Sequence, residues 1–241
     1  MVAAEGLTCM VRFRSPDKVE RVVRLDDVRG PDLAGALPWR QFRWYRGQQH
    51  FSGFWWSSTM GDHVIYESRL QLARLILADF DPGVEAIVAQ PFRLESVVDG
   101  QIRKHIPDFL LLGGGRPQVV NVKPRESLAN PKIRDTLAWA HGALEQRGWA
   151  TEVWSGTDPV LLANVRFLAG FRRPALFDPQ LLHAAAEAAV DHSVGDTEAA
   201  LSRRWPTVLV RPAILHLLWQ GRLRTDLSRL LDADTILRAA R

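Results

Sequence analysis

Two charged side chains lie in apolar runs where charge is costly, a third carboxylate lies in a helical segment, and the three types together suggest a particular chemistry. Glu67 falls in a segment with helical spacing of apolar residues, Asp108 follows Pro107 at the start of an apolar run, and Lys123 ends a second apolar run. In a strand buried on both faces, a charge is strongly unfavourable unless it is paired or bound to a metal ion. Two carboxylates and a lysine of this kind favour metal-dependent cleavage of phosphodiester bonds.

Asn121 lies two residues before Lys123, so both side chains share one face of the expected strand. If residues 105–123 form a hairpin about the Gly113–Gly115 turn, Asp108 comes close to that face. Asp108 could then bind Mg²⁺, with the Asn121 side chain or the backbone carbonyl of Val122 completing the coordination. Glu67 would hold a second metal or its water, and Lys123 would orient or deprotonate the attacking water.

The apolar patterns predict the elements that position these residues in a mixed α/β sheet flanked by helices. We expect Asp62 to cap the helix that carries Glu67, and Asp99-Gly100 to form a hairpin turn between the strand-like runs 84–98 and 105–112. In chain order the predicted elements are two short strands in residues 8–25, an irregular stretch 26–60, a helix from about 63 to 80, strands 84–98, 105–112 and 118–123, a helix 130–147 and a strand 149–154.

The C-terminal part is predicted to be helical, with a boundary near Arg172-Arg173-Pro174. Helices over 179–192, 196–205 and 207–219, followed by a short β element, suggest a small winged-helix-like domain. The expected organisation is therefore an N-terminal extension (1–60), a core (61–172) and a helical domain (173–241). The basic residues expected to contact DNA are Arg125, Lys132, Arg134, Arg211, Arg222 and Arg224; Trp44, Trp55 and Trp56 could stack on bases but fit core positions better.

The bulk composition limits the remaining possibilities. The chain has 241 residues, of which 46% are hydrophobic and 24% charged, with a formal net charge of +4 that permits a polyanionic partner. Cys9 is the single cysteine, which excludes an intrachain disulfide, and the seven histidines show no zinc-ligand spacing. No apolar run approaches the roughly 18 residues that a membrane span needs. We expect a cytoplasmic protein, associated with the nucleoid when it acts.

The order Glu67, Pro107-Asp108, Asn121-Val122-Lys123 resembles the PD-(D/E)xK nucleases of the restriction-endonuclease-like superfamily. The surrounding runs, FSGFWWSSTMGDHVIYESRLQLARLILADF, HIPDFLL and VVNVK, are similar to the TnsA-like endonuclease subunits of heteromeric transposases. The resemblance covers about residues 40–170. It implies a restriction-endonuclease-like fold with Glu67, Asp108 and Lys123 as catalytic residues and Mg²⁺ as cofactor, with Mn²⁺ able to substitute. Asn121 departs from the family, which usually has glutamine there.

The resemblance also implies a role and partners. TnsA-like subunits cut double-stranded DNA at the 5′ ends of a transposon, beside a DDE-type (TnsB-like) transposase and an ATP-dependent, TnsC-like regulator. Two alternatives remain open from the sequence. One is a stand-alone defence or repair nuclease with the same site; the other is a DNA-binding or scaffold protein whose metal site is weakened at Asn121.

Overall fold

The computed structural model describes residues 9–40, 51–98 and 100–240 and forms two compact units. The first unit contains residues 1–75 and 83–156, and the second contains residues 76–82 and 157–241. The division predicted at residue 172 falls inside the second unit, and the predicted N-terminal extension falls inside the first. The fold is mixed α/β, as predicted.

The first unit is built around a four-stranded sheet in the order β10-β9-β8-β5. Its strands are β5 (Ala86–Ala89), β8 (Phe109–Leu112), β9 (Gln118–Val122) and β10 (Ala150–Trp154). β8 pairs antiparallel with β9 about the predicted glycine turn, and β10 pairs parallel with β9. Gly113 is required in that turn because a Cβ there would lie 2.0 Å from the backbone oxygen of Gly83.

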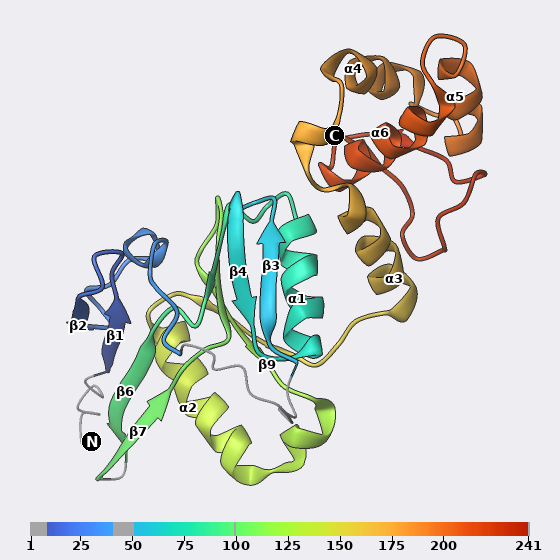
Figure 1. Ribbon diagram of the computed structural model, residues 1–241. Helices are drawn as coiled ribbons and strands as arrows, with labels where there is room; N and C mark the ends of the chain where they lie inside the picture. Colours follow the sequence, from blue (N-terminus) through green and yellow to red (C-terminus); the bar gives the residue numbers. More distant parts are fainter. Residues whose placement is uncertain (1–8, 41–50, 99, 241) are drawn as a thin grey trace. The chain divides into compact units, whose positions relative to one another are not determined.

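The predicted crossover helix is confirmed as α2 (Pro131–Gln146), which begins at the Asn130 cap and lies against β7 and β10 (Figure 1). Its side chains Ala140 and Leu144 share one buried cluster with Leu110 of β8 and Val119 of β9. Alternate residues of β9 therefore face α2, and Asn121 belongs to that set. This register decides where the polar side chain of Asn121 goes.

A second sheet, in the order β2-β1-β6-β7, continues the same core. The two strands predicted in residues 8–25 are confirmed as an antiparallel pair. The prediction of one strand over residues 84–98 was wrong, because Gln90, with φ +48°, separates β5 in one sheet from β6 in the other. The strands of this sheet are β1 (Met10–Arg14), β2 (Glu20–Arg24), β6 (Arg93–Val98) and β7 (Gln101–His105).

The predicted hairpin turn joins β6 to β7, with Val98 opposite Gln101. The expected partner strand, residues 105–112, is also divided in the structure. Its first residue ends β7, and β8 begins only after Asp108. The break at Pro107 places Asp108 at a sheet end, where its side chain can reach neighbouring elements.

The predicted helix start was wrong, and Glu67 does not lie in a helix. Residues 62–66 form β4 (Asp62–Tyr66), which pairs with β3 (Gly53–Ser57) in a stretch expected to be irregular. β-branched and aromatic side chains favour this hairpin, and Gly61 with φ +62° closes its turn. Helix α1 (Arg69–Phe80) starts later, where the Ser68 hydroxyl accepts a 3.1 Å hydrogen bond from the Gln71 backbone N–H.

The second unit contains helices and a small β pair. The three predicted C-terminal helices are present as α4, α5 and α6, and the short β element after them is a two-stranded pair. Apart from residues 76–82 at the end of α1, the elements of this unit are α3 (Pro159–Leu168), η3 (Ala169–Phe171), η4 (Pro174–Leu176), α4 (Pro179–Ala188), α5 (Val194–Leu201), α6 (Thr207–Trp219), β11 (Leu223–Arg224) and β12 (Arg238–Ala239); the first unit also has η1 (Gly30–Leu33) and η2 (Arg125–Ala129). None of the described helices is long and apolar enough to span a bilayer.

Candidate functional site at the end of the β8–β9 hairpin

Asp108 and Lys123 meet at the end of the β8–β9 hairpin, as the sequence predicted. The Lys123 Nζ atom lies 3.6 Å from Asp108 Oδ2. The same carboxylate oxygen accepts a 2.6 Å hydrogen bond from the Val122 backbone N–H. Because Asp108 precedes β8 and Lys123 follows β9, strand pairing alone brings the two side chains together.

Gln71 of α1 completes the hydrogen bonding of Asp108. Its amide nitrogen donates to Asp108 Oδ1 at 2.8 Å, and its amide oxygen accepts from the Glu67 backbone N–H at 2.6 Å. One glutamine thus ties the segment that carries Glu67 to the buried aspartate. The Glu67 carboxylate itself lies 3.6 Å from the Arg40 guanidinium.

The electrostatics of Asp108 reflect burial opposed by two favourable contacts. Burial raises the pKa of this carboxyl above its usual value, and the nearby negative charge of Glu67 raises it further. The Lys123 ammonium and the Val122 N–H lower the same pKa because both stabilise the ionised form. The charge of Glu67 therefore disfavours ionisation of Asp108, and a bound divalent cation would offset that repulsion.

The donor types present are those that Mg²⁺ prefers, although both oxygens of Asp108 also accept protein hydrogen bonds. Mg²⁺ is commonly held by one or two protein carboxylates together with water and substrate phosphate oxygens. Glu67 and Asp108 can supply the two carboxylates, and the Val122 carbonyl lies at the end of the neighbouring strand β9. Among the described residues, no group of three or more His, Cys, Asp and Glu side chains gathers as a metal-binding cluster.

Asn121 is fully buried and bonded to two histidines. Its Oδ1 lies 2.7 Å from His105 Nε2, and its Nδ2 lies 2.9 Å from His141 Nε2. With the amide in this orientation, His105 donates through Nε2 and His141 accepts through Nε2, which requires a neutral His141 ring; burial lowers the pKa of His105 as well. The predicted metal ligand thus already has its oxygen in a protein hydrogen bond, and it links β7, β9 and α2.

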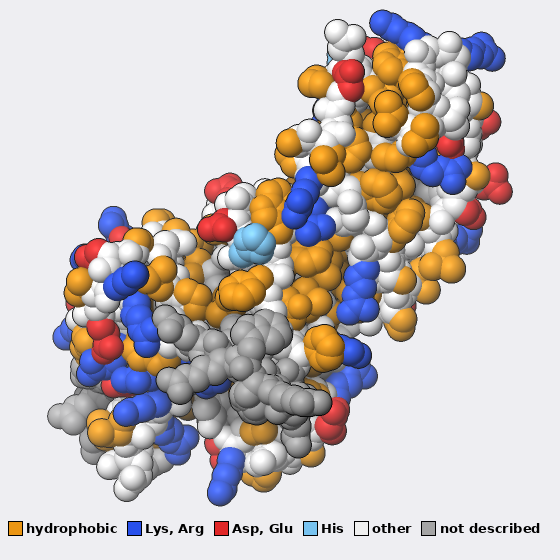
Figure 2. All heavy atoms as spheres, viewed as in Figure 1, with side chains coloured by type: hydrophobic (Ala, Val, Ile, Leu, Met, Phe, Trp, Pro, Cys, Tyr) orange, Lys and Arg blue, Asp and Glu red, His pale blue; other side chains and the backbone are white. Residues whose placement is uncertain are grey.

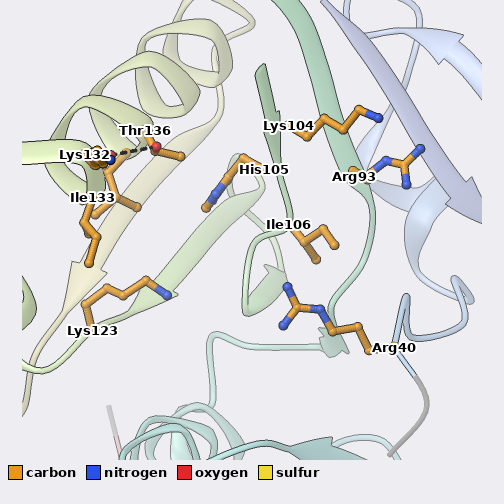
Figure 3. A pocket seen from close by; sticks show the side chains of 10 residues that line it. Arg40, Arg93, Lys104, His105, Ile106, Lys123, Lys132, Ile133 and Thr136 are labelled. Carbon is orange, nitrogen blue, oxygen red and sulfur yellow. Dashed lines mark hydrogen bonds between the residues drawn. The ribbon is translucent and has the colours of Figure 1, made fainter. Parts of the chain in front are cut away.

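A basic pocket opens beside Lys123. It has a volume of about 490 Å³, and Figure 3 shows Lys123 and Arg40 reaching towards its middle from opposite sides. Its lining contains no acidic side chain among the described residues. The lining residues are Arg40, Arg93, Lys104, His105, Ile106, Lys123, Lys132, Ile133, Thr136 and Leu137.

The other residues predicted to contact DNA divide into separate groups. Lys132 lines the same pocket as Lys123, whereas Arg125 and Arg134 are exposed but do not line it. In the second unit, Arg211 is engaged by Glu198 at 2.5 Å, and Arg222 and Arg224 are exposed. Trp55 and Trp56 are half-buried in β3, and Trp44 lies outside the described residues.

The sequence did not predict that four further residues lie at the site: Arg40, Gln71, His105 and His141. Gln71 had a local signal, because Ser68 and Gln71 form the Ser-x-x-Gln pattern of a helix start. That pattern would also have placed the start of α1 correctly. His141 had no local signal, since only the packing of α2 on β9 brings it to Asn121.

Comparisons with known proteins do not assign the chain to a family. No protein-family model matches the chain, and no curated protein matches it closely enough to count as a relative.

The histidines of the Asn121 cluster predict loss of stability in acid. Burial lowers the pKa of His105 to about 4 and also lowers the pKa of His141, whereas an unfolded histidine titrates near 6.5. The unfolded state therefore binds more protons in this window. We expect the free energy of unfolding to fall from about pH 6.5 downwards, by at most about 1.4 kcal/mol per pH unit for each histidine.

Urea denaturation at pH 7 and pH 5 measures this effect. His105→Gln, which can still donate to Asn121, should reduce the loss, and His183→Gln at an exposed position should not change it. An identical pH dependence in wild type and His105→Gln would contradict the assignment.

Proposed function

We propose that this chain is a Mg²⁺-dependent DNA endonuclease of the PD-(D/E)xK type, acting as the TnsA-like subunit of a heteromeric transposase. The observation that carries the proposal is the 3.6 Å approach of Lys123 to Asp108 at the end of a β-hairpin, with the Glu67 backbone tied to Asp108 through Gln71. A buried carboxylate with a raised pKa beside a lysine is typical of a functional site. The basic pocket next to Lys123 supports a phosphate-bearing substrate.

The chain's own residues have separate parts in the proposed reaction. Glu67 and Asp108 would hold Mg²⁺, and the bound cation would activate water and stabilise negative charge on the phosphate. Lys123 places its ammonium beside Asp108, where it can hold the attacking water and stabilise the developing charge. Gln71 and the Val122 N–H fix the Asp108 carboxylate in one orientation, so that its position does not depend on the substrate.

The test is nicking of a supercoiled plasmid that carries transposon ends. With Mg²⁺ or Mn²⁺, and with a DDE-type transposase as the proposed partner, we expect strand cleavage at the 5′ ends that EDTA abolishes. Cleavage by the chain alone, at sites unrelated to transposon ends, would favour a stand-alone nuclease. Absence of metal-dependent cleavage with the transposase present would overturn the proposal.

A second candidate is a DNA-binding scaffold with a weakened metal site. Asn121 stands at the position where many PD-(D/E)xK nucleases have a metal-binding carboxylate. The observation that favours the scaffold is that Asn121 is instead bonded to His105 and His141. Isothermal titration with Mn²⁺ separates the two candidates. A scaffold should show no binding that depends on Asp108, whereas the nuclease should.

A further inference from the structure

Two pockets of the first unit share one residue, Arg40. The first is the basic pocket beside Lys123, and the second, of about 680 Å³, is lined by Arg14, Lys18, Leu37, Pro38, Arg40, Phe54 and Ile65. Neither set of described lining residues includes an aspartate or a glutamate. The two pockets therefore adjoin, and their charged lining residues are all basic, although Arg40 at the junction also lies 3.6 Å from the Glu67 carboxylate.

Several of these cations are not neutralised by the protein. Lys18, Lys104 and Lys132 are exposed, and none forms an ion pair within residues 9–40, 51–98 and 100–240. Arg93 does pair with Glu95, at 2.5 Å, but Glu95 is also shared with Arg12. Basic side chains gather over the β1–β2–β6–β7 sheet in the space-filling view (Figure 2).

One tryptophan connects the two pockets. The guanidinium of Arg14, from the second pocket, lies 5.2 Å from the centre of the Trp39 ring, and that of Arg93, from the first, lies 4.6 Å from it. The Trp39 ring thus contacts one arginine of each pocket. The next residue in the chain, Arg40, lines both pockets. Such stacking orients the guanidinium groups and leaves their N–H groups able to donate.

The second pocket also offers an aromatic surface. Phe54 is 58% exposed although it lies in a strand, and its ring meets His63 edge-on at 6.4 Å. An exposed phenyl ring among cations is the combination that binds unpaired nucleotides, since the cations contact phosphates and the ring stacks on a base. A pocket for an acidic peptide would not need the aromatic surface.

We propose that the two pockets form one track for the DNA strand that is cut. The pocket beside Lys123 takes the phosphates around the scissile bond, Arg40 contacts the strand at the junction, and the second pocket takes the adjacent nucleotides with a base stacked on Phe54. The inference rests on the proposed function and deepens it, because it assigns the path of the substrate. It also predicts that the bases in the second pocket are unpaired.

The charge of the track is tested by DNA binding in EDTA, where no cleavage occurs. Fluorescence anisotropy with a labelled transposon-end duplex, at a series of KCl concentrations, gives the dependence of log affinity on log salt. Lys18→Ala/Lys104→Ala should reduce that slope by about 2, because each lysine neutralises one phosphate. The matched control is Arg24→Ala/Arg116→Ala, which removes two exposed cations that line neither pocket. Equal slopes in the two double variants would overturn the track.

The aromatic part is tested with a second pair of probes. Phe54→Ala should weaken binding of a duplex with a single-stranded overhang by about fivefold or more, while binding of a blunt duplex changes little. An equal effect of Phe54→Ala on both probes would overturn the stacking assignment. If Phe54→Ala weakened the binding of RNA and left the binding of DNA unchanged, the choice of DNA as substrate would be overturned. If the expected binding effects are found and no metal supports cleavage, the track stands and the nuclease proposal fails. If cleavage depends on Asp108 but the two double variants have equal slopes, the nuclease proposal stands and the track fails.

Discussion

Asp108→Asn should abolish metal-dependent nicking while the protein stays folded. Removing one of the two carboxylates proposed to hold Mg²⁺ takes away several kcal/mol of transition-state stabilisation, so we expect a fall in rate of about 10³-fold or more. The measurement is single-turnover nicking of end-bearing plasmid with Mg²⁺ and with Mn²⁺. Wild-type rates in this variant would overturn the assignment of Asp108.

Stability should respond differently from activity in the same variant. Burial raises the pKa of Asp108, so the folded state disfavours the ionised form, and the stability contribution of this group falls as pH rises through the folded pKa. A neutral amide removes that cost but places an N–H₂ group against the Gln71 donor, which weakens one hydrogen bond. We expect the free energy of unfolding at pH 7 to change by no more than about 1 kcal/mol.

A matched control shows whether charge removal alone has any effect. Asp135→Asn neutralises an exposed carboxylate on α2 and should leave both nicking and stability unchanged. If Asp108→Asn instead unfolds the protein, metal binding to the folded fraction at low temperature distinguishes loss of structure from loss of the site.

Lys123→Met should lower the nicking rate by about 10²- to 10³-fold while metal binding is retained. The substitution keeps an unbranched side chain at the end of β9 but removes the ammonium 3.6 Å from Asp108. A positive group that stabilises developing negative charge contributes to rate in that range. The measurements are single-turnover nicking and titration of Mn²⁺ binding.

The pH dependence of metal binding gives Lys123→Met a second readout. Lys123 lowers the pKa of Asp108, so its removal should move that pKa further upwards. Since the metal binds the ionised carboxylate, Mn²⁺ binding in the variant should weaken at a higher pH than in wild type. Arg116→Met, which removes an exposed cation elsewhere, should leave the binding curve in place. A variant that nicks normally would remove Lys123 from the mechanism.

The sequence was sufficient where local patterns are unambiguous. The β8–β9 hairpin, the crossover helix α2 and the parallel strand β10 follow from apolar runs, a glycine turn and a helix of suitable length. Because hairpin pairing follows from those local features, it was enough to bring Asp108 to Lys123. The predicted helix start near residue 63 was wrong because residues 62–66 fit both a helical stripe and a strand, and pairing with β3 decided between them.

The sequence by itself therefore determined the identity of the charged residues and the hairpin that joins two of them. Only the tertiary structure decided that Gln71 bonds to Asp108, that Asn121 is held by His105 and His141, and that Arg40 lines two adjoining basic pockets. Each of these arrangements joins segments far apart in the chain. Their formation depends on how helices pack against the sheet, and no pattern of neighbouring residues encodes that packing.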